Sequence, residues 1–141
     1  MPSNFEDVGL FHRKFNLPAV NNPRFAVADN EVPLDLLKFR ADFLQEELNE
    51  FNWAADSGDV AGMFDALIDL VYVALGTAHI MNLPWEAGWD QVQRANMAKV
   101  RAAKDGSDSK RGSSWDVVKP DGWCDPDLEA VLQSMGWTAA K

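Results

Sequence analysis

The sequence predicts an all-α helical bundle, and three observations support this fold class. Apolar residues recur at helical spacing through most of the chain, proline and glycine interrupt the pattern, and no run alternates apolar and polar residues as a strand would. The length of 141 residues and the hydrophobic content of 47% fit one globular domain. We therefore expect a single domain over residues 1–141 with a helical core at about 33–104.

The first three helices are bounded by these breaks. A short helix over about 5–16 ends at Leu17-Pro18. The second begins at Pro33, because proline fits a first helical turn, and continues to Gly58. Asp59 is a suitable N-cap for a third helix that continues to about residue 81.

The rest of the chain is expected to hold two more helices and a loop. Pro84 begins a fourth helix that extends to about residue 104. Residues 105–124 are polar and contain glycine, so we expect a basic loop or lid there. Asp125-Pro126 then caps a short helix to about residue 135. No strands are expected.

Charge is unevenly distributed along this acidic chain, whose net charge is −9. From Asp29 to Asp90 there are 13 acids against two bases, and from Arg94 to Lys119 seven bases against three acids. Such an acidic surface disfavours a nucleic-acid polymer as partner. The first residues lack a signal-peptide pattern, the longest apolar run is too short to span a membrane, and Cys124 is the one cysteine, so we expect a cytoplasmic protein without membrane contact.

The second helix carries glutamates on its apolar side. On a helical wheel, Glu47 and Glu50 fall within the arc of apolar residues, and Glu46 falls at its edge. A buried carboxylate without a partner is costly, so it must protonate, pair with a base or bind a metal ion.

The third helix is apolar on every side but contains Asp65 and Asp69, one turn apart on one face. If this helix packs antiparallel to the second, the two aspartates would converge with Glu47 and Glu50. Four carboxylates in one place need a cation, and an all-oxygen ligand set favours Mg²⁺, with Mn²⁺ as a substitute. A helix apolar all round also predicts a central position or a subunit interface.

Another interpretation is that these acids form core salt bridges with Arg40 or Arg94, but few bases occur in the same segment. A di-iron bundle needs a glutamate three residues before each of two histidines, and neither His12 nor His79 has one. We expect His12 at the surface and His79 as a hydrogen-bonded core residue.

The basic stretch could bind the anionic part of a substrate. Asn96 and Lys99 lie about one turn apart and can both reach phosphate oxygens. Further candidates for phosphate binding lie beside them or in the loop: Arg94, Lys110, Arg111 and Lys119. The other possibility is that these are ordinary solvated bases.

Three segments together resemble the all-α nucleoside triphosphate pyrophosphohydrolases, a superfamily that includes MazG-like enzymes, dimeric dUTPases and phosphoribosyl-ATP pyrophosphohydrolase. They are Glu46–Glu50, Asp65–Ala78 and Arg94–Val100. The similarity extends from about Pro33 to Leu128 and is greatest to the small MazG-like proteins often encoded by phages, in which case the compartment would be the host cytoplasm.

The resemblance implies which acids bind the metal. The family pattern is Glu-x-x-Glu followed by Glu-x-x-Asp, and Glu47, Glu50 and Asp69 match three of its positions. The remaining glutamate would fall at Ala66, so Asp65 is the expected substitute. Glu46 and Glu47 are the expected catalytic residues, with Glu46 holding a second cation or acting as a base.

The resemblance also implies an activity and an assembly. The expected activity is Mg²⁺-dependent hydrolysis of a nucleoside triphosphate to the monophosphate and pyrophosphate, in a homodimer or a dimer of dimers. By analogy with nucleotide-pool enzymes of phages, a purine such as dGTP or GTP is the expected substrate. The alternatives are an inactive nucleotide-binding protein and a helical interaction module.

Overall fold

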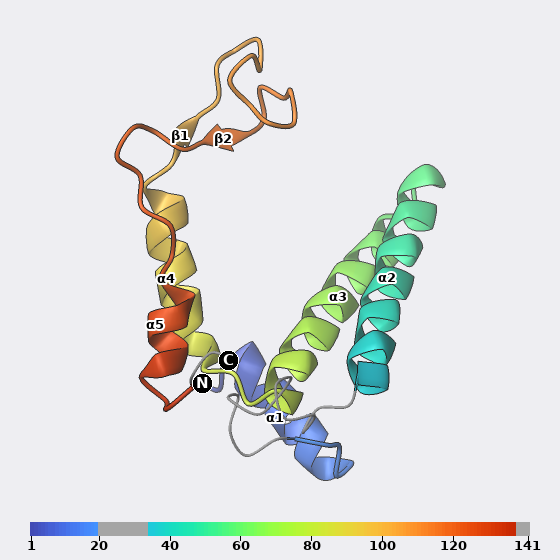
Figure 1. Cartoon of the computed structure of the whole chain (residues 1–141). Helices are drawn as coiled ribbons and strands as arrows, with labels where there is room; N and C mark the ends of the chain where they lie inside the picture. Colours follow the sequence, from blue (N-terminus) through green and yellow to red (C-terminus); the bar gives the residue numbers. More distant parts are fainter. Residues whose placement is uncertain (20–33, 138–141) are drawn as a thin grey trace. The chain divides into compact units, whose positions relative to one another are not determined.

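A computed structural model describes residues 1–19 and 34–137, and its helices are shown in Figure 1. About 60% of the chain is helical and 3% is strand, which confirms the predicted all-α class. The chain divides into two compact units, Met1–Pro84 with Leu132–Lys141, and Trp85–Val131. The stretch between the first two predicted helices, residues 17–33, lies mostly outside the described residues.

The first unit begins with helix α1, Asn4–Lys14. Its N-terminus is a capping box, in which the Ser3 hydroxyl accepts from the backbone N–H of Glu6 and the Glu6 carboxylate accepts from the backbone N–H of Ser3. Two backbone donors that the helix cannot satisfy internally are thereby paired. The predicted helix over about 5–16 is confirmed to within two residues.

Helices α2, Leu34–Asp56, and α3, Val60–Ile80, form a hairpin and lie side by side (Figure 1). Gly58 connects them at a φ of 70°, a left-handed conformation that glycine adopts without strain. Asp59 caps α3 by accepting a hydrogen bond from the backbone N–H of Gly62, as expected. The short connection makes the two helices antiparallel, so residues near the end of α2 face residues near the start of α3.

The second unit begins with α4, Trp85–Met97, which is shorter than predicted. The prediction of a helix to about residue 104 and of a chain without strands is wrong. Strand β1, Val100–Arg101, pairs antiparallel with β2, Val117–Val118, and the loop between them joins the pair. β-Branched valines favour this extended pairing. Asp108 Oδ1 also accepts a hydrogen bond from the backbone N–H of Ala103, which holds the chain outside a helical path.

The end of the second unit returns along α4. Trp123 donates from Nε1 to the carbonyl oxygen of Ala95, at 2.6 Å, and the backbone N–H of Asp127 donates to the side-chain oxygen of Gln91. Helix α5, Leu128–Gln133, follows and is shorter than the predicted last helix. Trp123 therefore anchors the chain after the β1–β2 hairpin.

A buried polar cluster joins the three helices of the first unit. Arg40 of α2 donates to the carbonyl oxygen of Val73 at 2.8 Å and to the Thr77 hydroxyl at 3.0 Å, both on α3. His12 of α1 is buried too, so the expectation that it lies at the surface is wrong. Burial is the main cause that lowers the pKa of His12, and the Arg40 charge adds to it. His79 is hydrogen-bonded to the carbonyl oxygen of Phe5, as expected of a core histidine.

Gly76 of α3 makes this cluster possible. A Cβ atom at position 76 would lie 2.5 Å from His12 Nε2 and 2.6 Å from a terminal nitrogen of Arg40. We expect Gly76→Ala to lower the free energy of unfolding by roughly 1–3 kcal/mol, because it overpacks a buried polar contact. Chemical denaturation measures this, with Gly88→Ala as control. A Cβ at Gly88 meets Leu128 at 3.7 Å, so that variant should be neutral or slightly stabilised. Equal stability of the two variants would contradict the packing described for Gly76.

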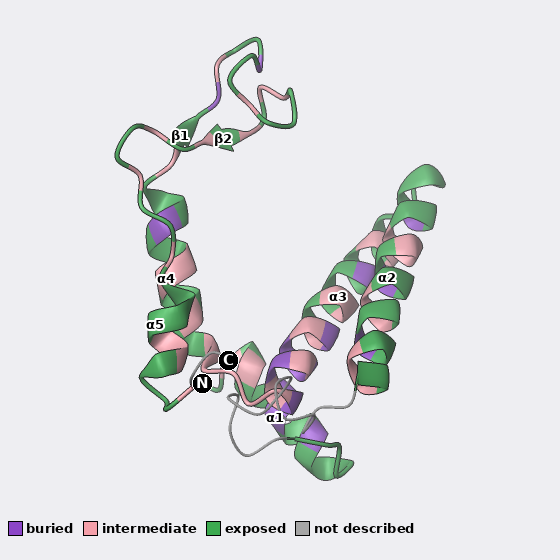
Figure 2. Cartoon of the chain, viewed as in Figure 1, coloured by how far each residue is buried: buried purple, intermediate pink, exposed green. Residues whose placement is uncertain are grey.

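Helix α3 is buried unevenly (Figure 2). Its second half packs against α1 and α2 and holds most of its buried residues. Large apolar side chains from its first half to just past its middle remain exposed, among them Phe64, Leu67 and Val71. Among the described residues α3 is the one helix long and apolar enough to cross a membrane, a test that core helices of soluble proteins also pass. The absence of membrane contact stays a prediction.

Candidate active site

The glutamates of α2 differ in exposure as their helical positions predict. Glu47 is 7% exposed, Glu50 is half-buried and Glu46 is exposed. All three lie on one stretch of α2, the helix that packs along α3. The arc of apolar residues therefore predicted correctly which glutamate is taken out of water.

Glu47 is a buried carboxylate surrounded by like charges. Its pKa is raised to about 7, first by burial and then by the negative charges of Glu50 and Asp69. A hydrogen bond with the Glu50 side chain and the charge of Glu46 contribute in the same direction. Oxygen Oε2 of Glu47 is fully buried and has no hydrogen-bond partner among the described residues. Such an atom is expensive to leave unpaired, so the site is suited to a cation or a donor that the chain itself does not supply.

Asp69 of α3 lies close enough to Glu47 for their charges to interact. It is half-buried, and burial followed by the Asp65 charge raises its pKa. Asp65 itself is exposed. Electrostatic coupling thus runs from Asp65 to Asp69, from Asp69 to Glu47, and from Glu47 to Glu50. The hairpin brings the predicted acids of both helices within interaction range.

The salt-bridge interpretation of these acids finds no support in the described part of the chain. Arg40 donates to a carbonyl and a hydroxyl instead, and Arg94 donates to Gln91 and to the carbonyl oxygen of Asp125. The ion pairs of the described residues join other side chains, for example Lys38 with Asp42 at 2.7 Å. The acids therefore lack a cationic partner from residues 1–19 and 34–137.

The donor set fits an oxygen-preferring divalent cation. It consists of carboxylates alone, and one of their oxygens is buried and unpaired. Within the described ranges, no three acidic, histidine or cysteine side chains are gathered tightly enough to hold a metal ion without moving. Rotation of side chains would have to complete the coordination, so the ligand roles of Glu47, Glu50, Asp65 and Asp69 stay predictions.

The predicted phosphate ligands lie in the second unit and separate into two groups. One group lines a pocket of about 370 Å³ at the hairpin: Lys99, Lys110, Arg111 and Lys119. The other two, Arg94 and Asn96, are exposed on α4 and are not part of that pocket. The acids belong to the first unit, so the convergence of both sets on one substrate stays a prediction.

Sequence reasoning missed the residues that hold these bases in place. Asp116 accepts from Arg111 at 2.6 Å, and the Trp123 ring lies under the ammonium groups of Lys99 and Lys119. No helical or strand period signals these contacts, because Arg111, Asp116 and Trp123 lie outside regular helices and strands, and Lys99 lies far from Trp123 in the sequence. The buried Arg40 was signalled, because it lies seven residues before Glu47 and therefore on the same side of α2.

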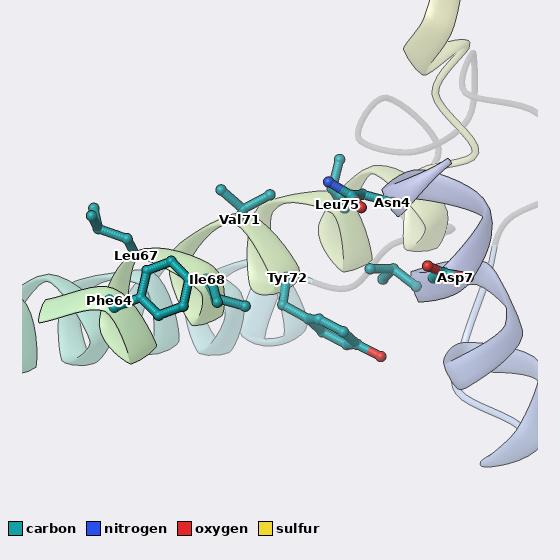
Figure 3. A pocket seen from close by; sticks show the side chains of 9 residues that line it. Asn4, Asp7, Phe64, Leu67, Ile68, Val71, Tyr72 and Leu75 are labelled. Carbon is teal, nitrogen blue, oxygen red and sulfur yellow. The ribbon is translucent and has the colours of Figure 1, made fainter. Parts of the chain in front are cut away.

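An apolar groove of about 510 Å³ lies between α1 and α3 (Figure 3). Phe64, Leu67 and Val71 project from α3, and Asn4 and Asp7 reach the groove from α1. Tyr72 lies in the same row of side chains. A groove lined by large exposed apolar side chains marks a surface for binding rather than for solvent.

The chain matches the model of one known family, phosphoribosyl-ATP pyrophosphohydrolase, over residues 8–96. The matched region includes most of α1, all of α2 and α3 and nearly all of α4, and therefore the acids of the candidate site on α2 and α3. It ends before Lys99 and the hairpin. No curated protein matches the chain.

Proposed function

The chain belongs to the phosphoribosyl-ATP pyrophosphohydrolase family, which points to a nucleotide pyrophosphohydrolase, and on this premise we propose that it hydrolyses a nucleoside triphosphate to the monophosphate and pyrophosphate. The observation that carries the proposal is the buried, unpaired Glu47 carboxylate beside Glu50 and Asp69 inside the matched region. A purely structural core would not retain several mutually repelling acids without a cation.

In the proposed mechanism Glu47, Glu50, Asp65 and Asp69 hold Mg²⁺, for which Mn²⁺ can substitute. The bound ion would neutralise phosphate charge and lower the pKa of a bound water. Water attacks the α-phosphorus, the bond from this phosphorus to the bridging oxygen breaks, and pyrophosphate leaves. Glu46 is exposed at the edge of the acidic site and accepts the proton of the attacking water, or helps to hold a second cation.

The Asn96 amide and basic side chains of the second unit bind the phosphates in this proposal. The bases are Lys99, Arg94, Lys110, Arg111 and Lys119. A purine nucleotide such as dGTP or GTP is the proposed substrate, and the proposed setting is control of the nucleotide pool in the cytoplasm, that of the host if the gene belongs to a phage.

The test is pyrophosphate release with Mg²⁺ across all ribonucleoside and deoxyribonucleoside triphosphates, with phosphoribosyl-ATP included. The proposal expects release from at least one triphosphate, fastest with dGTP or GTP, and none after chelation of the metal. An inactive nucleotide-binding protein would bind without releasing pyrophosphate. A helical interaction module would show no rise in Tm on addition of nucleotide and Mg²⁺, whereas a true site must raise it by mass action.

We also propose that the exposed apolar side chains of α3 between residues 64 and 71 are covered by a second copy of the chain. Val71 and Phe64 are 52% and 67% exposed in the single chain, and both line the apolar groove. Burial of such side chains is worth roughly 1.5–3 kcal/mol each, which favours self-association.

Val71→Glu is expected to convert a dimer or tetramer into a monomer, measured by light scattering coupled to size-exclusion chromatography. Trp115→Glu is the control, because Trp115 is exposed in the hairpin loop and outside the groove. A wild-type chain that is monomeric at micromolar concentration would contradict the assignment. So would a Val71→Glu variant that keeps the wild-type mass.

A further inference from the structure

A cationic pocket lies at the β1–β2 hairpin, outside the region that matches the family. Its volume of about 370 Å³ falls at the lower end of the range for small-molecule sites, roughly 300–1,000 Å³. Four cationic side chains line it, together with Asp108, Asp116 and two valines: Lys99, Lys110, Arg111 and Lys119. Cations therefore outnumber acids in the pocket although the whole chain carries a net charge of −9.

Both acids of the pocket are already engaged. Asp116 Oδ1 accepts from Arg111 at 2.6 Å and from the backbone N–H of Val117, and its Oδ2 accepts from the Ser109 hydroxyl at 2.6 Å. These hydrogen bonds lower the pKa of Asp116 to about 2, so it stays charged and holds Arg111 in place. Asp108 accepts from the backbone N–H of Ala103. Asp116 is thus paired with Arg111, and neither acid forms an ion pair with a lysine among the described residues.

Two of the three lysines of the pocket lie over one aromatic ring. The ammonium groups of Lys119 and Lys99 lie 4.6 Å and 5.5 Å from the centroid of the Trp123 ring, which is fixed by its hydrogen bond to Ala95. Lys119 has a long ion pair with Asp125, at 3.7 Å, and Lys110 makes no ion pair with any described residue. Like charges held close together without a matching acid are unfavourable unless an anion joins them.

We propose that this pocket binds the linked phosphates of a polyphosphate, either the triphosphate tail of the nucleotide or free pyrophosphate. Several separate ammonium and guanidinium groups around one cavity match an anion with several charged oxygens better than they match a single carboxylate. The identity of the phosphate compound rests on the proposed function. The pocket itself does not, because its contacts all lie within the second unit. Trp123 and Asp116 act as positioning residues, since they orient the bases.

The experiment is calorimetric titration of the full chain with sodium pyrophosphate, with chelator present so that the carboxylates of the first unit bind no metal. We expect pyrophosphate to bind the wild-type chain. Its affinity for the Lys110→Ala and Lys119→Ala variants should be at least about tenfold lower. Lys104→Ala is the matched control, because Lys104 lies at the same hairpin but outside the pocket, and its affinity should equal that of the wild type. Asp69→Asn should also bind as the wild type does.

Two further titrations identify the source of the phosphates. A nonhydrolysable nucleoside triphosphate that binds more tightly than pyrophosphate indicates the substrate tail, and the reverse order indicates the product. Sodium sulfate at equal ionic strength should bind at least about tenfold more weakly than either, because it carries fewer charged oxygens.

The pocket and the proposed function fail in different ways. The proposal for the pocket is overturned if the wild-type chain does not bind pyrophosphate. It is also overturned if the Lys110→Ala and Lys119→Ala chains bind pyrophosphate as tightly as the wild type. Both outcomes hold even if the chain hydrolyses nucleotides. Binding that is lost in the two variants but kept in Lys104→Ala supports the pocket even if no nucleotide is hydrolysed.

Discussion

Asp69→Asn and Glu50→Gln are each expected to reduce pyrophosphate release by at least about a hundredfold while leaving the helical content unchanged. Each substitution replaces a charged oxygen by an amide of nearly the same shape, so packing between α2 and α3 is kept. The site, however, loses a negative charge that the proposed mechanism needs to hold Mg²⁺. Initial rates measure the loss, and far-ultraviolet circular dichroism measures the fold.

Asp42→Asn is the matched control for these variants. Asp42 lies on α2 like Glu50, but it is exposed and paired with Lys38. It should retain the wild-type rate. Asp65→Asn tests the ligand that departs from the family pattern: a loss comparable to that of Asp69→Asn would assign Asp65 as a ligand, and a loss below about tenfold would limit it to an electrostatic role. Near wild-type activity of Asp69→Asn or Glu50→Gln would refute the assignment of the acids.

Local periodicity was enough to predict which glutamates of α2 are taken out of water. The burial of Glu47 and the exposure of Glu46 follow from their positions relative to Leu44 and Phe51, because a regular helix fixes which face each residue occupies. The antiparallel hairpin followed from the short connection at Gly58. Local sequence therefore determined both the face and the neighbour of these carboxylates.

Contacts between distant residues could not be predicted in this way. The end of α4 depends on the pairing of Val100 with Val118, across a long loop. The burial of His12 depends on close approach of α1 to α3, which Gly9 and Gly76 permit because they lack side chains. In both cases the competing local structure, a longer helix or a surface histidine, satisfies the sequence pattern equally well.

Glu47→Gln is expected to stabilise the metal-free chain above pH 7. The folded chain holds the proton of Glu47 up to a pKa of about 7, whereas the unfolded chain releases it near 4.5. The folded state therefore binds more protons between these values, and the stability of the wild type falls as the pH rises from about 4.5 through 7. Glutamine does not ionise, so the variant avoids this loss.

The gain should be roughly 1–3 kcal/mol at pH 8, or several degrees in Tm, and should nearly vanish at about pH 4, below both pKa values. Thermal melts with chelator measure it at both pH values. Glu46→Gln is the control: Glu46 is exposed and its charge is the smallest contribution to the raised pKa of Glu47, so its gain at pH 8 should be much smaller.

Mg²⁺ should reverse the order of the wild type and Glu47→Gln at pH 8. The wild-type carboxylate becomes a ligand, so millimolar Mg²⁺ raises the wild-type Tm by mass action, and the variant gains less because it has lost a charged oxygen. The Glu47 carboxylate would then destabilise the folded chain without the ion and stabilise it with the ion. If the variant is less stable than the wild type at pH 8 in chelator, the carboxylate already has a partner within the chain. If both respond equally to Mg²⁺, Glu47 does not bind the ion.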